Sequence, residues 1–206
     1  MHTTYQFQAP QLTGATNRIS EAYGASVWLW MHHLRHRELS IKNLDRRLLE
    51  PIQQGQYVLA CSRATRSQHD PVALLLYACL NAQAESRYLK NPTAPLPHGD
   101  WRSGDRLWLI DWVSPFGQSL QLRRRMLALF ARQTARSLRR HPRANEDRVQ
   151  TWLGETCTPQ GAQSWWQERP ILNNPQSTPA WPGATNWEPT VPADLLSHDN
   201  RGRACA

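Results

Sequence analysis

Apolar positions recur along this chain at two different periods, and the period decides which element each segment is expected to form. Spacings of three and four residues predict helices from Ser20 into the Trp28–Trp30 run, from Ser40 past Leu48 toward Pro51, from Asn81 to Lys90, and from Ser119 to Arg140. Short apolar runs bounded by turn residues predict strands over 56–62, 72–80, 107–113 and 148–153. His36 is therefore expected just past the end of the first helix.

The order of these elements predicts a fold class of α/β type, with a mixed, mostly antiparallel sheet flanked by helices. The 206 residues suffice for one domain with a proper core and are too few for two generous ones. We expect residues 1–18 to be a polar N-terminal extension and residues 19–158 to be the folded domain. Residues 159–206 hold seven of the 15 prolines and four tryptophans. They predict an extended tail that wraps its own domain or a dimer mate, with simple disorder as the alternative.

One acidic residue, Asp111, interrupts the apolar, Trp-rich strand over 107–113. A carboxylate in such a strand is unfavourable unless it is hydrogen-bonded or paired. It is either a structural anchor for backbone amides or the partner of a catalytic group. Taken alone, the strand favours the anchor.

Positive charge is concentrated in one part of the chain, although the whole chain carries a net charge of +8. No acidic residue lies between Trp112 and Asn145, whereas eight arginines do: Arg123, Arg124, Arg125, Arg132, Arg136, Arg139, Arg140 and Arg143. A basic helix would attract an acidic partner, or would simply be a solvated face. Nucleic acid is not the expected partner, because no recognisable binding motif is present.

Other classes are disfavoured by what the sequence lacks. Residues 1–18 have no apolar signal-peptide core, and the longest apolar run, Val72–Leu80, is far shorter than the ~20 residues of a membrane span. The four cysteines show no zinc or redox spacing, so we expect reduced thiols.

Motifs from about Gly24 to Gly154 resemble those of the RTX toxin-activating lysine-acyltransferases, bacterial enzymes that fatty-acylate internal lysines of a co-expressed pore-forming protoxin. The matching pieces, in order, are Trp28-Leu29-Trp30, His36-Arg37, Gln56-Tyr57, Pro71-Val72-Ala73, Glu85 with Tyr88-Leu89, Asp100-Trp101, Ser103-Gly104-Asp105-Arg106, Ile110-Asp111-Trp112 and Pro115-Phe116-Gly117. The long ordered block is specific, whereas Trp-Leu-Trp alone would be weak.

The resemblance implies a GNAT-type acyltransferase fold, a homodimer and a cytoplasmic location. It also implies an enzyme with no cofactor and no metal, which takes the acyl group from acyl carrier protein and gives it to an RTX protoxin. One departure from coenzyme A-dependent GNAT enzymes agrees with this donor. Residues 116–121 lack the basic, Gly-rich loop that would hold a pyrophosphate at a helix start.

By the same resemblance, His36 is the base that accepts the lysine proton and Asp111 is its partner; a direct attack by His36 on the thioester remains open. Arg37 is expected either to stabilise the oxyanion or to pair with a carboxylate. His33 stands where the family commonly has Ser, and it could tune His36 electrostatically. His32 and His36 have the spacing of a metal pair, but the Glu and third ligand of a zinc site are missing.

The proposed docking residues for acyl carrier protein are Arg123, Arg124, Arg132 and Arg136, on the expected basic helix. Two other functions remain open. The chain could be a non-catalytic adaptor of the same fold that binds acyl carrier protein or protoxin, or, more distantly, a nucleic-acid-binding protein that uses the Arg-rich helix. The intact His36 and Asp111 favour the enzyme.

Overall fold

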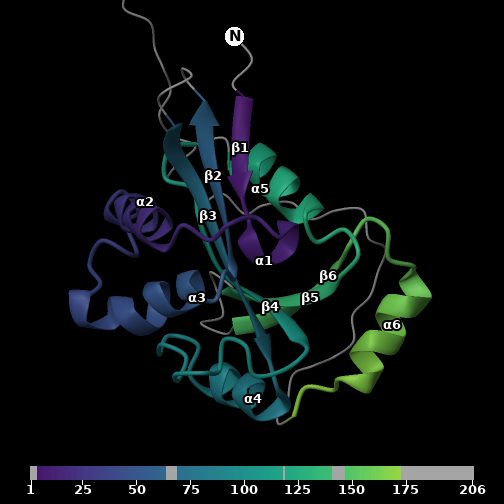
Figure 1. Cartoon of the computed structure of the whole chain (residues 1–206). Coiled ribbons are helices and arrows are strands. Elements are labelled where there is room, and N and C mark those ends of the chain that lie inside the picture. The colour runs from purple at the N-terminus through teal and green to yellow at the C-terminus, as the bar shows by residue number, and fades with distance from the viewer. Residues whose placement is uncertain (1–3, 64–68, 118, 141–146, 173–206) are drawn as a thin grey trace, which may run out of the picture.

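A six-stranded sheet forms the centre of the computed structural model, which describes residues 4–63, 69–117, 119–140 and 147–172 (Figure 1). The strands lie in the sheet in their order along the chain: β1 (Thr4–Gln8), β2 (Tyr57–Arg63), β3 (His69–Leu80), β4 (Arg106–Val113), β5 (Thr134–Arg140) and β6 (Asp147–Leu153). All neighbours are antiparallel except β4 and β5, which are parallel. The expected mixed, mostly antiparallel sheet is confirmed.

Helices cover both faces of this sheet and divide the core into two clusters (Figure 1). The helical segments are α1 (Pro10–Thr13), α2 (Ile19–Met31), a 3-10 turn (Ile41–Asn43), a π-helical turn (Asp45–Leu49), α3 (Glu50–Gln53), α4 (Ala82–Lys90), α5 (Ser119–Ala128) and α6 (Pro159–Glu168). Buried side chains of α2, α3 and α4 join one cluster, and those of α5 join the other.

The helices expected from Ser20 into the Trp28–Trp30 run and from Asn81 to Lys90 are confirmed as α2 and α4. The side chain of Asn81 accepts a hydrogen bond from the backbone N–H of Ala84 at 2.8 Å, so it caps α4 as its residue type predicts. The segment after Ser40 is helical in three short pieces, without a side-chain cap at Ser40. Leu48 is fully buried there, but Ile41, which shares its helical spacing, is 83% exposed.

The prediction of one long helix from Ser119 to Arg140 is wrong. The helix α5 ends at Ala128, and after a turn the chain becomes strand β5, which pairs with β4 on one side and β6 on the other. Leu138 matched the apolar stripe of the helix by coincidence of spacing. The β4 residues that pair with Arg136 and Ser137 are Trp108 and Leu109, 28 positions earlier in the chain, so a local pattern does not reveal this pairing.

Both predicted extensions contain regular structure. Residues 4–8 of the N-terminal extension form β1, the edge strand that pairs with β2. At the other end, Pro159–Glu168 is the helix α6 and not extended chain. Pro159 occupies the first turn, where its missing N–H is no loss, and Thr158 accepts a hydrogen bond from Gly161 N. The rest of the predicted tail, 173–206, lies outside the described residues.

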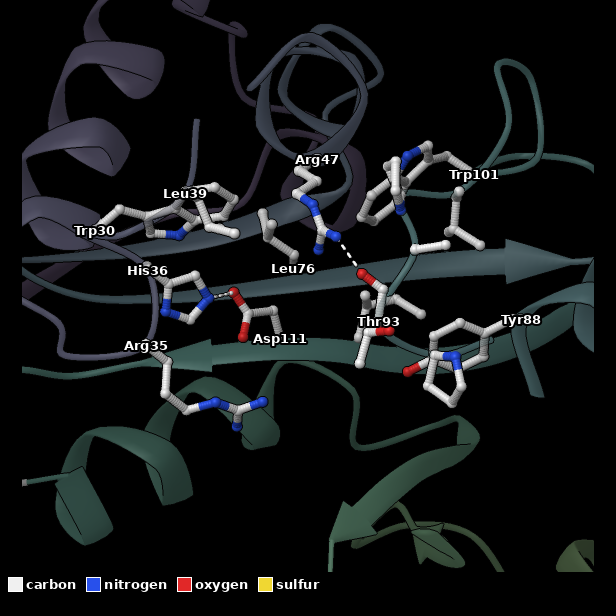
Figure 2. A pocket seen from close by; sticks show the side chains of 15 residues that line it. Trp30, Arg35, His36, Leu39, Arg47, Leu76, Tyr88, Thr93, Trp101 and Asp111 are labelled. Atoms are coloured by element: carbon white, nitrogen blue, oxygen red, sulfur yellow. Dashed lines mark hydrogen bonds and ion pairs between the residues drawn. The ribbon is translucent and has the colours of Figure 1, made fainter. Parts of the chain in front are cut away.

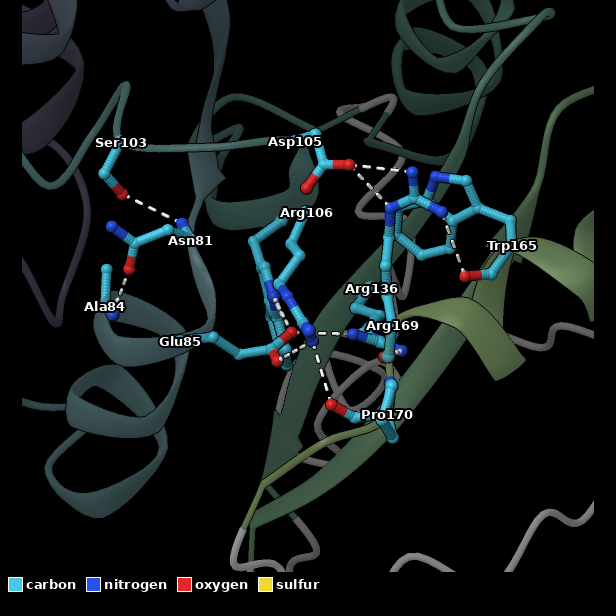
Figure 3. Close-up of polar contacts among 11 residues, drawn as sticks. Asn81, Ala84, Glu85, Ser103, Asp105, Arg106, Arg136, Trp165, Arg169 and Pro170 are labelled. Carbon is cyan, nitrogen blue, oxygen red and sulfur yellow. Dashed lines mark hydrogen bonds and ion pairs between the residues drawn. The ribbon is translucent and has the colours of Figure 1, made fainter.

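A buried ion cluster joins α4 to the middle of the sheet (Figure 3). The carboxylate of Glu85 accepts hydrogen bonds from Arg106 Nη1 at 2.6 Å, Arg136 Nη1 at 2.7 Å and Trp108 Nε1 at 2.8 Å. Arg106 also donates to the backbone carbonyl of Pro170, at 2.9 Å. The cluster therefore holds α4, β4, β5 and the segment after α6 together.

Candidate active site

The turn that follows α2 positions the histidines. The backbone N–H of His33 donates to Trp30 O at 3.1 Å, and that of His36 donates to His33 O at 3.0 Å, so residues 32–36 form successive tight turns. The indole of Trp30 is buried in the core, and its ring centroid lies 4.7 Å from the imidazole of His36. The second Trp of the Trp-Leu-Trp motif, Trp30, thus supports the ring of the predicted base, His36.

A β-bulge in β4 positions the predicted carboxylate. Leu109 pairs with Tyr77 of β3, but the next pairing joins Asp111 to Leu76, so Ile110 is an extra residue on β4. A bulge shifts the alternation of side chains by one residue from that point onward.

The consequence of this shift is visible in the core clusters. Beyond the bulge, Trp112 joins the cluster on the α5 face and Val113 joins the cluster on the α2 face, the reverse of regular alternation from Leu109. Ile110 and Asp111 consequently line the same pocket on the α2 side. Without the bulge, Asp111 would face the opposite side of the sheet from His36.

His36 and Asp111 meet as the sequence predicts. Nε2 of His36 lies 2.8 Å from Oδ2 of Asp111, and the two side chains are 12% and 25% exposed. Such a carboxylate holds the imidazole in one orientation and stabilises the imidazolium that forms when the ring accepts a proton. The pair is partly shielded from solvent and still accessible from the pocket.

His33 touches the same pair. Its Nδ1 lies 2.7 Å from Nδ1 of His36, and the two ring centroids are 4.7 Å apart. The pKa of His33 is lowered from its ordinary value of 6.5, first by burial and then by repulsion from His36 and Arg35, while Asp111 acts in the opposite direction. Burial therefore favours the neutral form of His33.

The pocket beside this pair has a volume of about 260 Å³ and combines apolar walls with two cations (Figure 2). Its apolar walls come from α2 and the segment after it, from β3, α4 and β4, and from the loop over 91–105 that joins α4 to β4. The lining residues are Trp30, Leu39, Leu76, Tyr88, Pro92, Ala94, Pro95, Leu96, Trp101 and Ile110. Figure 2 shows Arg35 near the His36–Asp111 pair and Arg47 across the pocket, where it donates to the backbone carbonyl of Thr93. Such a site suits a ligand with a polar reacting group and an apolar chain.

The sequence analysis did not single out Arg35 or Arg47. Burial lowers the pKa of Arg47, and Asp111 partly opposes that effect. Within the ranges that the structure describes, Nε of Arg47 is buried and has no hydrogen-bond partner. In the sequence Arg47 looks no different from Arg46, so no local signal marks it.

Arg37, the expected supporting residue, does not line the pocket. It is exposed, and its Nε lies 3.0 Å from Oε1 of the equally exposed Glu38. The structure thus agrees with its carboxylate-pairing alternative and places Arg35 nearer the pair.

The four predicted docking arginines do not share one surface. Arg124 and Arg132 are exposed, on α5 and in the turn after it. Arg123 is half-buried over the Trp152 ring, 4.8 Å from its centroid, and burial lowers its pKa to about 10. Arg136 lies on β5, is 2% exposed and binds Glu85, so it is not a docking residue. The broken helix separates these positions.

Among the described residues, no group of three or more His, Cys, Asp or Glu side chains is placed to hold a metal ion. His32, one half of the considered metal pair, instead places Nδ1 2.8 Å from the backbone oxygen of Trp28. No helix in the described part of the chain has the length and apolar character to cross a membrane. The described cysteines, Cys61, Cys79 and Cys157, are free thiols.

Comparison with known proteins gives a consistent result. The sequence profile of the RTX toxin acyltransferase family matches residues 15–153. The leukotoxin-activating lysine-acyltransferase of Mannheimia haemolytica serotype A1 is 36% identical over 60% of this chain and 70% of its own length. The protein-lysine palmitoyltransferase of Bordetella bronchiseptica is 36% identical over 71% of this chain and 77% of its own. The leukotoxin-activating lysine-acyltransferase of Aggregatibacter actinomycetemcomitans is 32% identical over 74% and 87%.

Proposed function

This chain belongs to the RTX toxin acyltransferase family, and from that premise we propose that it transfers a fatty acyl group from acyl carrier protein to the ε-amino group of internal lysines of an RTX protoxin. The observation that carries the proposal is the His36–Asp111 pair, 2.8 Å apart at the wall of an apolar pocket. A non-catalytic adaptor would have no need of this pairing.

The chemistry requires a proton acceptor and a stabiliser of negative charge. A lysine side chain has an ordinary pKa of about 10.4 and is a nucleophile only after it has lost its extra proton. His36 receives the proton that the amine releases as the C–N bond forms, and Asp111 stabilises the resulting imidazolium. Arg35 and Arg47 supply positive charge for the oxyanion of the tetrahedral intermediate.

The apolar walls of the pocket support a fatty acyl substrate. Each methylene that leaves water for such a surface contributes roughly 0.8 kcal/mol of binding free energy. The pocket volume of about 260 Å³ lies just below the range of about 300–1,000 Å³ for ligand sites. It would accommodate the reacting carbonyl and part of the chain.

The donor is proposed to be a carrier protein, as the resemblance implies. The exposed Arg124 and Arg132 lie in a stretch of sequence without acidic residues, and such charges would orient an acidic carrier during encounter. We also retain the homodimer, the cytoplasmic location and the GNAT-type fold as proposals. The consecutive strand order and the helices on both faces of the sheet are compatible with that fold.

The direct test is intact-mass analysis of an RTX protoxin after incubation with this protein and palmitoyl-acyl carrier protein. The wild type should add one acyl mass per modified lysine, and His36→Ala should add none while keeping the wild-type circular dichroism spectrum. His32→Ala is the matched control, because His32 is exposed and lies outside the pocket. Binding of carrier or protoxin without any added mass would favour the adaptor.

A further inference from the structure

His36 contacts the carboxylate of Asp111 through one ring nitrogen and the imidazole of His33 through the other. We infer that His33 and His36 form a two-histidine proton relay: Nε2 of His33 takes the proton of the attacking amine, and Nδ1 of His33 passes its own proton to Nδ1 of His36. The inference rests on the proposed acyl transfer, since it assigns the path of the proton in that reaction.

The hydrogen-bond partners fix where the protons lie. The ionised carboxylate of Asp111 can only accept, so Nε2 of His36, 2.8 Å away, carries a hydrogen. In neutral His36 the other nitrogen, Nδ1, is then bare. It lies 2.7 Å from Nδ1 of His33, and two bare nitrogens would repel at that distance. Nδ1 of His33 is therefore the donor, and Nε2 of His33 is the bare nitrogen.

This arrangement leaves only one imidazole lone pair for the substrate. Both nitrogens of His36 are occupied, one by Asp111 and one by His33. No described residue donates a hydrogen bond to Nε2 of His33. The His33 ring is half-buried beside His36 and is not part of the pocket lining, so the relay requires the amine to approach from the surface of the turn while the acyl group occupies the pocket. The charged groups that act on His33 are His36, Asp111 and Arg35. Burial first, and then the positive charge of Arg35, lower the pKa of His33 and so favour its neutral form, which is the form that accepts a proton.

The step balances without any further reactant. The amine nitrogen forms a bond to the thioester carbon, and its proton goes to Nε2 of His33 while the Nδ1 proton of His33 moves to His36. His36 is then an imidazolium that faces the carboxylate of Asp111. When the C–S bond breaks, the same two transfers run in reverse and the proton reaches the departing thiolate. The relay returns to its starting state.

The relay also separates the two roles left open for His36. A nucleophilic attack on the thioester needs a bare imidazole nitrogen directed at the carbonyl carbon. Neither nitrogen of His36 is free for this attack, and the adjacent indole of Trp30, tilted by 38° with its centroid 4.7 Å away, limits rotation of the ring. The geometry favours His36 as the proton-holding base.

The first test needs no substrate. Nitrogen-15 NMR of the histidine side chains in the full-length protein at neutral pH reports which ring nitrogens carry hydrogen. The relay requires His36 protonated at Nε2 and bare at Nδ1, and His33 protonated at Nδ1 and bare at Nε2. The opposite tautomer of either ring would overturn the relay, even in a protein that is active in acyl transfer.

The second test separates transfer from orientation. In His33→Asn the side-chain amide can still donate toward Nδ1 of His36 but cannot accept a proton. Turnover should fall by about 10²-fold or more, within the range for acid–base groups, with little change in KM for the carrier and an unchanged melting temperature. Turnover of His33→Asn within about twofold of wild type would show that His33 only orients His36.

These outcomes are distinguishable from a failure of the proposed function. If the wild type itself transfers no acyl group, the acyltransferase proposal fails and the tautomers still test the hydrogen-bond arrangement. If the wild type is active and His36→Ala is inactive, but His33→Asn matches the wild type, the relay alone is wrong.

Discussion

Replacing Glu85 with glutamine tests the buried ion cluster that joins α4 to β4 and β5. The Glu85 side chain is 1% exposed, and its carboxylate faces the guanidinium groups of Arg106 and Arg136, whose side chains are 10% and 3% exposed. Glutamine has nearly the same shape, but it removes the negative charge and presents an N–H₂ group where one oxygen accepted hydrogen bonds. A donor then meets a donor, and two buried cations lose their counter-charge.

The magnitude follows from this geometry. Breaking a buried ion pair by removing one partner typically costs about 3–5 kcal/mol, because the remaining charge stays desolvated. A domain of ordinary stability has only about 5–15 kcal/mol of unfolding free energy. For a chain of this size each kcal/mol corresponds to roughly 2–4 °C, so the melting temperature should fall by about 6–20 °C.

Thermal unfolding followed by circular dichroism measures this loss. The control is Asp105→Asn, because Asp105 also pairs with an arginine, Arg169 at 2.7 Å, but is 68% exposed. An exposed pair contributes about 1 kcal/mol at most, so the control should melt within a few degrees of wild type. If Glu85→Gln melts as high as Asp105→Asn, the cluster does not stabilise the fold and the reasoning fails.

Four further predictions concern the site and its surroundings. Asp111→Asn should lower turnover by about 10²–10⁴-fold, measured by steady-state acyl transfer, because the amide cannot stabilise the imidazolium; near-normal turnover would return Asp111 to a purely structural role. Charge reversal of Arg124 and Arg132 to Glu should raise KM for acyl carrier protein with little change in turnover, as added salt should for wild type, and indifference to both would remove these residues from docking. Arg136→Glu should instead unfold the protein, seen as a lost melting transition, because it places two buried carboxylates together. The pKa of His33 is lowered in the folded state, so the unfolded chain binds the proton first as the pH falls. The stability contribution of His33 is therefore complete above pH 6.5 and is lost as the pH falls through the folded-state pKa. Urea unfolding at about pH 7.5 and about pH 5.5 should show a smaller decrease in the free energy of unfolding for His33→Asn than for wild type.

The sequence determined those elements whose signals are local. The helix α2, the Asn81-capped helix α4 and the strands β2, β3, β4 and β6 follow from apolar periodicity and capping residues, and the structure confirms them within a few residues. The family motifs also identified His36 and Asp111, although they lie 75 positions apart in the numbering and meet at 2.8 Å. Motif order thus carried information that no single element contains.

The tertiary structure decided what depends on partners distant in sequence. The polar edge strand β1 and the strand β5 form because other strands pair with them. The local pattern of β5 had predicted a continuation of the helix α5. Arg136 is buried because it pairs with Glu85 of α4, which is distant in the sequence. The basic composition of the surrounding sequence had predicted a charge that faces solvent.

The bulge at Ile110 was decided in the same way, since a register shift between β3 and β4 leaves no mark in either sequence. That one extra residue turns Asp111 to the face of the sheet where His36 lies. The contact between His33 and His36 likewise depends on the turn geometry after α2, not on spacing alone. The sequence determined which residue types form the site, and long-range pairing of the backbone determined the direction in which their side chains point.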